Sequence, residues 1–234
     1  MTSLGEHWEA EATRWIALVR REGRPPALEE TDFNFPRFLG VLPPPAAGPA
    51  LEIGCGEGRT THALRAGGYD VEGIDVSETM IAAARRADPF GRYAVADAAA
   101  LPFEDETFAL VVAFMALHHM DDLAGVVAEA ARVLRPGGCF CFVVPHPYRT
   151  AGESYFDQHE YVVRGESEDG AFELWSVHRP LEVFHAALAG AGLAIELLAE
   201  PRPFADAAAE EERWRREPFA LHVRAAKVAA AALR

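Results

Sequence analysis

The sequence predicts an α/β fold, with a doubly wound, seven-stranded, mostly parallel sheet that carries helices on both faces. Three observations support this prediction. Between residues 50 and 144, short apolar runs alternate with segments of helical periodicity, as in chains of βαβ units. The run Phe108–Phe114 (FALVVAF) is apolar throughout, as expected of a central strand covered on both faces. The segment ALEIGCGEGRTT, residues 50–61, joins a strand to a helix through three glycines.

The alternation assigns each element a range. Ser77 is a suitable N-cap for the second of the helices that follow the strands, and Pro136-Gly137-Gly138 predicts a turn before the fifth strand. The predicted strands are Ala50–Ile53, Val71–Ile74, Tyr93–Ala96, Phe108–Phe114, Cys139–Val144, Leu193–Leu198 and Pro218–Arg224. The predicted helices are Gly58–Ala66, Ser77–Arg86, Asp121–Leu134 and Leu181–Ala191.

The segments outside this alternation predict the domain organisation. Residues 1–48 are expected to form an N-terminal helical lid, because apolar residues such as Trp8 and Trp15 recur at helical spacing before the segment PPPAAG. Residues 49–234 form the main domain. Within it, residues 145–179, rich in Tyr, His, Glu, Gly and Ser, are predicted to be a substrate-side insertion after the fifth strand. Glu210–Arg216 is expected to be a solvated face or loop, and Ala225–Arg234 a helical or frayed tail.

Composition excludes several classes of protein. The 234 residues are 50% hydrophobic and carry a net charge of −14, which disfavours a nucleic-acid substrate. Three cysteines without further metal-ligand spacing predict free thiols and no metal site. The charged first residues do not resemble a signal peptide, and no apolar stretch is long enough to cross a bilayer. We therefore expect a soluble, cytoplasmic protein without a membrane partner.

The glycine-rich turn differs from the phosphate-binding patterns. Dinucleotide-binding turns follow G-x-G-x-x-G, whereas here Gly54, Gly56 and Gly58 alternate and Arg59 stands at the last position. No Gly-Lys-Ser/Thr follows, so the P-loop pattern is also absent. By itself, the turn is equally compatible with a tight strand-to-helix connection.

Two acidic residues at strand ends indicate a nucleoside pocket. Asp75 lies 21 residues after Gly54 at the end of the second strand, where a carboxylate accepts hydrogen bonds from ribose hydroxyls. Asp97 ends the third strand, where it can accept from an adenine amine while the Ala98 N–H reaches a ring nitrogen. Glu52 and Asp75 together make the site acidic, which suits a cationic ligand better than pyrophosphate.

Four ordered motifs carry a family resemblance: LEIGCGEG, GIDVS, VADAAALPFEDETFALVVAFMALHHMDD and RVLRPGG. Their order resembles that of the class I S-adenosylmethionine-dependent methyltransferases, which have a Rossmann-like fold. The similarity is closest to the small-molecule enzymes of ubiquinone and menaquinone biosynthesis and of bacterial natural products. It covers residues 48–145 most strongly. It implies S-adenosylmethionine as cofactor and S-adenosylhomocysteine as product.

The resemblance also implies a role for individual residues. Acidic residues would lie below the methionine moiety and at the ribose hydroxyls, apolar residues would pack on the adenine, and strand 4 would end at the methionine amino group. In chain order, the implied cofactor-binding residues are Glu52, Gly54, Cys55 and Gly56 at the methionine, Asp75 at the ribose, Val76, Asp97 and Ala98 at the adenine, and Phe114 and Met115 at the amino group.

The resemblance leaves the methyl acceptor open. Methyl transfer to O or C of a small aromatic or polycyclic metabolite is the leading hypothesis, and His119 and His146 are the candidate general bases for a hydroxyl. Strand 4 is followed by FMAL and not by the Asn/Asp-Pro-Pro-aromatic segment of nucleic-acid N-methyltransferases. The alternatives are a non-catalytic, partner-binding methyltransferase-like subunit and an NAD(P)-dependent oxidoreductase. Either a monomer or a homodimer is compatible with the sequence.

Overall fold

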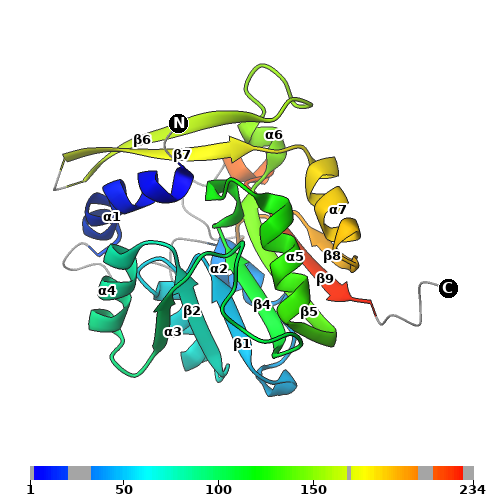
Figure 1. Cartoon of the computed structure of the whole chain (residues 1–234). Coiled ribbons are helices and arrows are strands. Elements are labelled where there is room, and N and C mark those ends of the chain that lie inside the picture. The colour runs from blue at the N-terminus through cyan, green and yellow to red at the C-terminus, as the bar shows by residue number, and fades with distance from the viewer. Residues whose placement is uncertain (1–2, 21–32, 168–169, 205–212, 229–234) are drawn as a thin grey trace.

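The computed structural model describes residues 3–20, 33–167, 170–204 and 213–228. A seven-stranded sheet forms its centre, in the order β3-β2-β1-β4-β5-β9-β8, and a separate hairpin pairs β6 with β7 (Figure 1). The strands are β1 (Ala50–Ile53), β2 (Val71–Asp75), β3 (Arg92–Val95), β4 (Phe108–Phe114), β5 (Leu134–Pro145), β6 (His159–Ser167), β7 (Gly170–His178), β8 (Leu193–Ala199) and β9 (Ala220–Lys227).

Helices precede and connect these strands. The α-helices are α1 (Leu4–Val19), α2 (Asn34–Leu39), α3 (Arg59–Ala66), α4 (Glu78–Ala87), α5 (Leu123–Val133), α6 (Pro147–Thr150) and α7 (Leu181–Gly190). The chain also forms two short 3-10 helices, η1 (Pro45–Ala47) and η2 (Leu117–His119). As predicted, the Ser77 side chain accepts a hydrogen bond from the Met80 N–H at the start of α4.

The sheet confirms the predicted doubly wound topology. β1 pairs in parallel with β2 and β4, β2 with β3, and β4 with β5, whereas β9 runs antiparallel to both β5 and β8. The carboxyl ends of β1, β2, β3 and β4 therefore meet at one edge. From β1 the chain adds β2 and β3 on one side, and it then adds β4 and β5 on the other side of β1. The strand order therefore changes direction between β1 and β4, and open α/β sheets bind ligands at such a point.

Helices cover both faces of the sheet. On one face, side chains of α5 and α7 such as Val127 and Leu188 join a buried cluster with the strand residues Ile53, Val111 and Phe142. On the other face, Phe38 of α2 and Leu64 of α3 pack on a second group of strand residues. The fully apolar character of β4 follows from this arrangement, because both of its faces are buried.

Two predicted ranges differ from the structure. Residues 225–227 continue β9 and do not begin a helical tail, because Ala225 pairs with Phe140 inside the sheet and is fully buried. β5 begins at Leu134 and includes the predicted turn at Pro136-Gly137-Gly138 as an irregularity in its pairing with β4. Of the charged segment 210–216, residues 213–215 form a 3-10 turn, and residues 210–212 lie outside the described residues, as do 229–234 of the tail.

Helix α1 and the strands β6 and β7 pack on one another beside the ligand-binding edge. Helix α1 lies above α4 and contacts it, and β6 and β7 lie above α1 (Figure 1). His7 of α1 stacks on Trp175 of β7, with ring centroids 5.2 Å apart. Within the described part of the chain, no helix is long and apolar enough to cross a membrane.

Candidate active site

A cavity of about 540 Å³ lies between the carboxyl ends of the parallel strands and helix α1. Every residue that the sequence assigned to cofactor binding lines it, as does His119. In chain order, the assigned residues are Glu52, Gly54, Cys55, Gly56, Asp75, Val76, Asp97, Ala98, Phe114 and Met115.

The glycines of the turn serve different purposes. Gly54 has φ +68°, and a Cβ there would lie 2.6 Å from the Ala116 Cβ, so a side chain at this position would displace the segment after β4. Gly56 has φ +54°, and a Cβ there would meet nothing within 4 Å. The backbone at Gly56 is therefore open to the cavity, and a ligand can approach it closely. The family resemblance implies that the methionine part of S-adenosylmethionine lies here.

The Asp75 carboxylate is held in place by the backbone. Its Oδ2 accepts from the Gly56 N–H at 2.8 Å, and its Oδ1 accepts from the Ser77 N–H at 2.9 Å. Each oxygen keeps a further lone pair for a ligand hydroxyl. Burial raises the pKa of Asp75 despite these two hydrogen bonds. The arrangement fits the two vicinal hydroxyls of a ribose.

Glu52 differs electrostatically from our expectation. It is buried in β1 and accepts a hydrogen bond from the Thr61 hydroxyl. Burial raises the pKa of Glu52 to about 8, and the neighbouring Glu57 and Asp75 add to this effect. The side chain is therefore mainly protonated at neutral pH, and the negative charge of the cavity comes from its other carboxylates.

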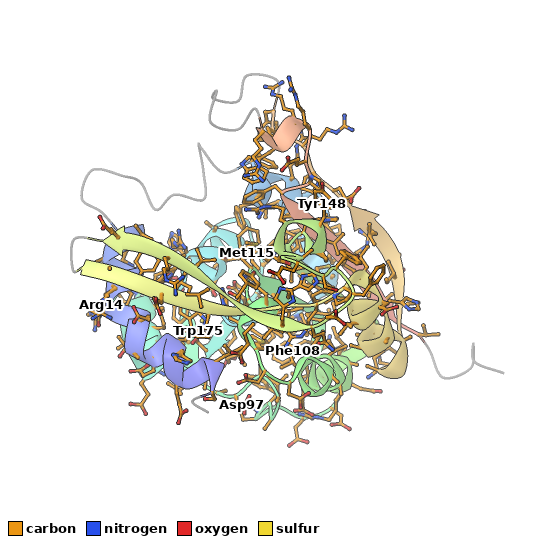
Figure 2. All side chains as sticks on the ribbon, turned by 90° about the horizontal axis from the view of Figure 1, so that it is seen from above. Arg14, Asp97, Phe108, Met115, Tyr148 and Trp175 are labelled. Carbon is orange, nitrogen blue, oxygen red and sulfur yellow. The ribbon has the colours of Figure 1, made fainter. Side chains whose placement is uncertain are left out.

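The adenine side of the predicted pocket is open. Asp97 accepts from the Ala99 N–H at 2.8 Å, and the Val76 side chain is half exposed. Gly5 of α1 lies against Val76, since a Cβ at Gly5 would be 3.3 Å from a Val76 methyl group. In Figure 2, Asp97 is labelled beside the end of α1 that is farther from Arg14.

Helix α1 contributes part of the cavity wall. Trp8 and Trp15 both line the cavity and contact each other edge to face, with ring centroids 5.6 Å apart. Arg59 lines the cavity beside Trp15 and pairs with the carboxylate of Glu57. The apolar spacing of this helix is the basis of the predicted N-terminal lid, and the tertiary structure decides which of its side chains line the cavity.

His119 is held in one tautomer by the hairpin. Its Nδ1 lies 2.9 Å from the Trp175 carbonyl oxygen, which can only accept, so Nδ1 carries the proton and Nε2 is the unprotonated nitrogen. Nε2 makes no hydrogen bond to any residue that the structure describes. Burial lowers the pKa of His119 to about 4, so the ring is neutral at physiological pH. It is therefore able to accept a proton from a ligand in the cavity.

His146 occupies a different environment. It precedes α6, where its Nδ1 accepts from the Tyr148 N–H at 3.1 Å and its Nε2 lies 2.8 Å from a Glu200 carboxylate oxygen. It does not line the cavity. The structure thus brings one of the two predicted bases to the cofactor residues and places the other among structural contacts.

Further residues of the site were not expected from the sequence. Met120, Asp121 and Asp122 line the cavity, and Asp121 accepts from the Leu4 N–H at the start of α1. Asp122 caps α5 by accepting from the Gly125 N–H. A cap signature was visible in the sequence, but the contact between Asp121 and α1 depends on the tertiary fold.

Comparison with known proteins defines the class. Residues 51–142 match the family model described as a methyltransferase domain. A solved S-adenosylmethionine-dependent methyltransferase from Mesorhizobium loti superposes with a TM-score of 0.69 at 26% identity, covering 82% of this chain and 96% of that one. Fold, cavity and motifs thus define a class I methyltransferase domain.

The chain is similar to S-adenosylmethionine-dependent methyltransferases, among them enzymes that methylate small molecules. It is 41% identical over 109 residues to a 27-O-demethylrifamycin SV methyltransferase of Amycolatopsis mediterranei, a match covering 44% of this chain and 40% of that protein. It is 37% identical over 105 residues to a malonyl-[acyl-carrier protein] O-methyltransferase of Enterobacter lignolyticus, covering 45% and 42%. The matches therefore span about two fifths of these relatives.

Proposed function

We propose that the chain transfers a methyl group from S-adenosylmethionine to an oxygen atom of a small aromatic or polycyclic metabolite. The observation that carries this proposal is the position of His119, which has an unprotonated Nε2 and lines the same cavity as Asp75 and the glycine turn. A neutral imidazole beside a cofactor pocket suits removal of a hydroxyl proton. The names of both relatives described above, which concern O-methylation, support oxygen as the acceptor atom.

Each group has a defined task in this proposal. When bound, S-adenosylmethionine supplies a methyl group on a sulfonium centre. Asp75 binds the ribose hydroxyls, and the open backbone at Gly56 accommodates the methionine part. His119 accepts the proton of the acceptor hydroxyl on Nε2. Trp8 and Trp15 exclude water from the cavity and offer apolar surface to an aromatic acceptor.

The cofactor half of the proposal is tested by calorimetry with S-adenosylhomocysteine. We expect a 1:1 complex for the wild type and at least about 30-fold weaker binding for Asp75→Asn. The asparagine amide would face either the Gly56 or the Ser77 N–H, so one backbone hydrogen bond is lost together with the charge. Asp70→Asn is the matched control, because Asp70 is exposed and pairs with Arg92. Absence of binding by the wild type would refute the proposal.

The acceptor half is tested with methyl-labelled donor and a panel of phenols, polycyclic alcohols and carboxylic acids. We expect label in O-methyl ethers. Label in C-methyl products would show that the acceptor atom is carbon and not oxygen. Cofactor binding without transfer to any member of a broad panel would favour the non-catalytic, partner-binding alternative.

A further inference from the structure

Arg179 is a buried cation that binds three backbone carbonyls. It lies between the end of β7 and the start of α7 and is 4% exposed. Its Nη1 donates to the Leu117 carbonyl at 3.1 Å, and its Nη2 donates to the Met120 and Asp121 carbonyls at 2.5 and 3.1 Å. Burial lowers its pKa, and the nearby charges of Asp121 and Asp122 oppose this effect. Burying a guanidinium is costly, and the three carbonyl hydrogen bonds offset part of that cost.

The three carbonyls belong to the segment that follows β4 and lines the cavity. His119, Met120 and Asp121 of this segment are part of the cavity wall. The segment begins with a constrained backbone, because Met115 has φ +53° and the Ala116 methyl group packs against Gly54. A shift of this segment would therefore move the proposed base and press on the glycine turn.

The hairpin end holds the same segment at a second point. Four residues before Arg179, the Trp175 carbonyl accepts the Nδ1 proton of His119. β7 and the residue after it thus contact both the imidazole and the backbone around it. Only a guanidinium presents donors in the planar fork that reaches three carbonyls at once, whereas a lysine ammonium is a point charge.

We propose that Arg179 is a positioning residue for methyl transfer: it fixes the 117–121 segment and, through it, holds His119 against the cofactor site. The inference rests on the proposed function, because it assigns a purpose to the position of His119. It also assigns a role to the 145–179 insertion, whose hairpin determines the geometry of the site from outside the parallel sheet.

The test compares Arg179→Met and Arg179→Lys with the wild type. Methionine keeps much of the length of the side chain and removes all its donors, and lysine keeps the charge without the fork. Arg164→Met is the matched control, because Arg164 lies on β6 of the same hairpin and pairs with Glu173 at an exposed position. Each variant is examined by thermal unfolding, by calorimetry with S-adenosylhomocysteine at 25 °C, and by NMR of ¹⁵N-labelled histidine, with the His119 signals assigned from His119→Gln.

In Arg179→Met, we expect the His119 ¹⁵N shifts to move toward a mixture of tautomers and S-adenosylhomocysteine to bind about tenfold more weakly. Arg179→Lys should show a smaller change in the same direction, and Arg164→Met none. A lower unfolding temperature with unchanged His119 shifts, and affinity within about twofold of wild type, would make Arg179 merely structural and overturn the inference.

The outcomes separate this inference from the proposed function. If the wild type fails to bind S-adenosylhomocysteine, the proposed function is wrong, and the proposed role of Arg179 in methyl transfer is overturned with it. The His119 spectrum then shows only whether Arg179 orders the segment. If Arg179→Met does not fold, the test rests on Arg179→Lys. Unchanged His119 shifts and unchanged affinity in that variant would contradict the proposed role of the guanidinium.

Discussion

Burial determines the charge states of single side chains in the cavity. His119 and Glu52 line the same cavity, yet burial moves their pKa values in opposite directions, to about 4 and about 8. Desolvation disfavours the charged form of either group. Both side chains are therefore mainly neutral near pH 7, and Asp75 remains the principal acid of the ribose site.

His119→Gln tests the proposed base. With an acceptor from the labelled panel, we expect kcat to fall roughly 100-fold while S-adenosylhomocysteine binds within about threefold of wild type. Because the neutral ring is the base and its pKa is about 4, the wild-type rate should be lost only as the pH falls through about 4. An NMR titration of His119 measures this pKa directly.

His146, the second predicted base, provides the control for the His119→Gln experiment. His146→Gln should leave kcat near the wild-type value, because His146 does not line the cavity and its Nε2 lies beside Glu200. A large loss of kcat in His146→Gln together with a normal rate in His119→Gln would reverse the assignment.

At the scale of elements, helix α1 forms one wall of the cavity. Ser3 caps the helix in a capping box with Glu6, and the Leu4 N–H donates to Asp121. Glu9, one turn further on, accepts from the hydroxyl groups of Ser77 and Thr79 at the start of α4. Helix α1 is thus bound to both sides of the cavity, which supports a lid role for this helix within residues 1–48.

Glu9→Gln tests whether α1 limits cofactor exchange. We expect S-adenosylhomocysteine to dissociate several-fold faster in stopped-flow measurements, because glutamine weakens the hydrogen bonds to Ser77 and Thr79, and at this exposed position the loss is about 1 kcal/mol. Glu11→Gln removes the same charge from the same helix but only a contact with Arg14, and it should leave the rate unchanged. Equal dissociation rates in the two variants would exclude the fastening role of Glu9.

At the scale of the whole molecule, buried titratable groups determine how stability depends on pH. Burial lowers the pKa values of His118, His119 and His222, so the folded state binds fewer protons than the unfolded chain below pH 6.5. Their contribution is present above pH 6.5 and is lost as the pH falls toward 4. Glu52 acts in the opposite direction, since its raised pKa favours the folded state at lower pH.

Burial also lowers the pKa of His146 and raises that of Asp75. The imidazoles with lowered pKa values outnumber Glu52 and Asp75, so we expect the free energy of unfolding to fall by a few kcal/mol between pH 7 and pH 5. Urea unfolding at the two pH values measures the difference. Glu52→Gln should make the fall steeper, because it removes the opposing contribution. A fall that becomes shallower in Glu52→Gln would contradict the pKa shift assigned to Glu52.

Most of the cofactor half of the site was predictable because its signals are local. The alternation of strands and helices positions Asp75 and Asp97 at strand ends, and parallel strands bring such ends to one edge. The apolar run of β4 similarly predicted its burial. Residues 225–227 were misassigned because alanines favour helices locally, whereas pairing with β5 decided their structure.

The sequence by itself determined the sheet, the glycine turn and the position of Asp75 and Asp97 at strand ends, because each depends on patterns within a few tens of residues. The family resemblance implied the other assigned cofactor residues. The tertiary structure alone decided how distant segments meet there. It decided which side chains of α1 line the cavity, placed His146 outside it, and brought Arg179 to the carbonyls of a segment about 60 residues earlier in the chain. It also decided the charge states of Glu52 and His119, because desolvation depends on what the folded chain packs around a group.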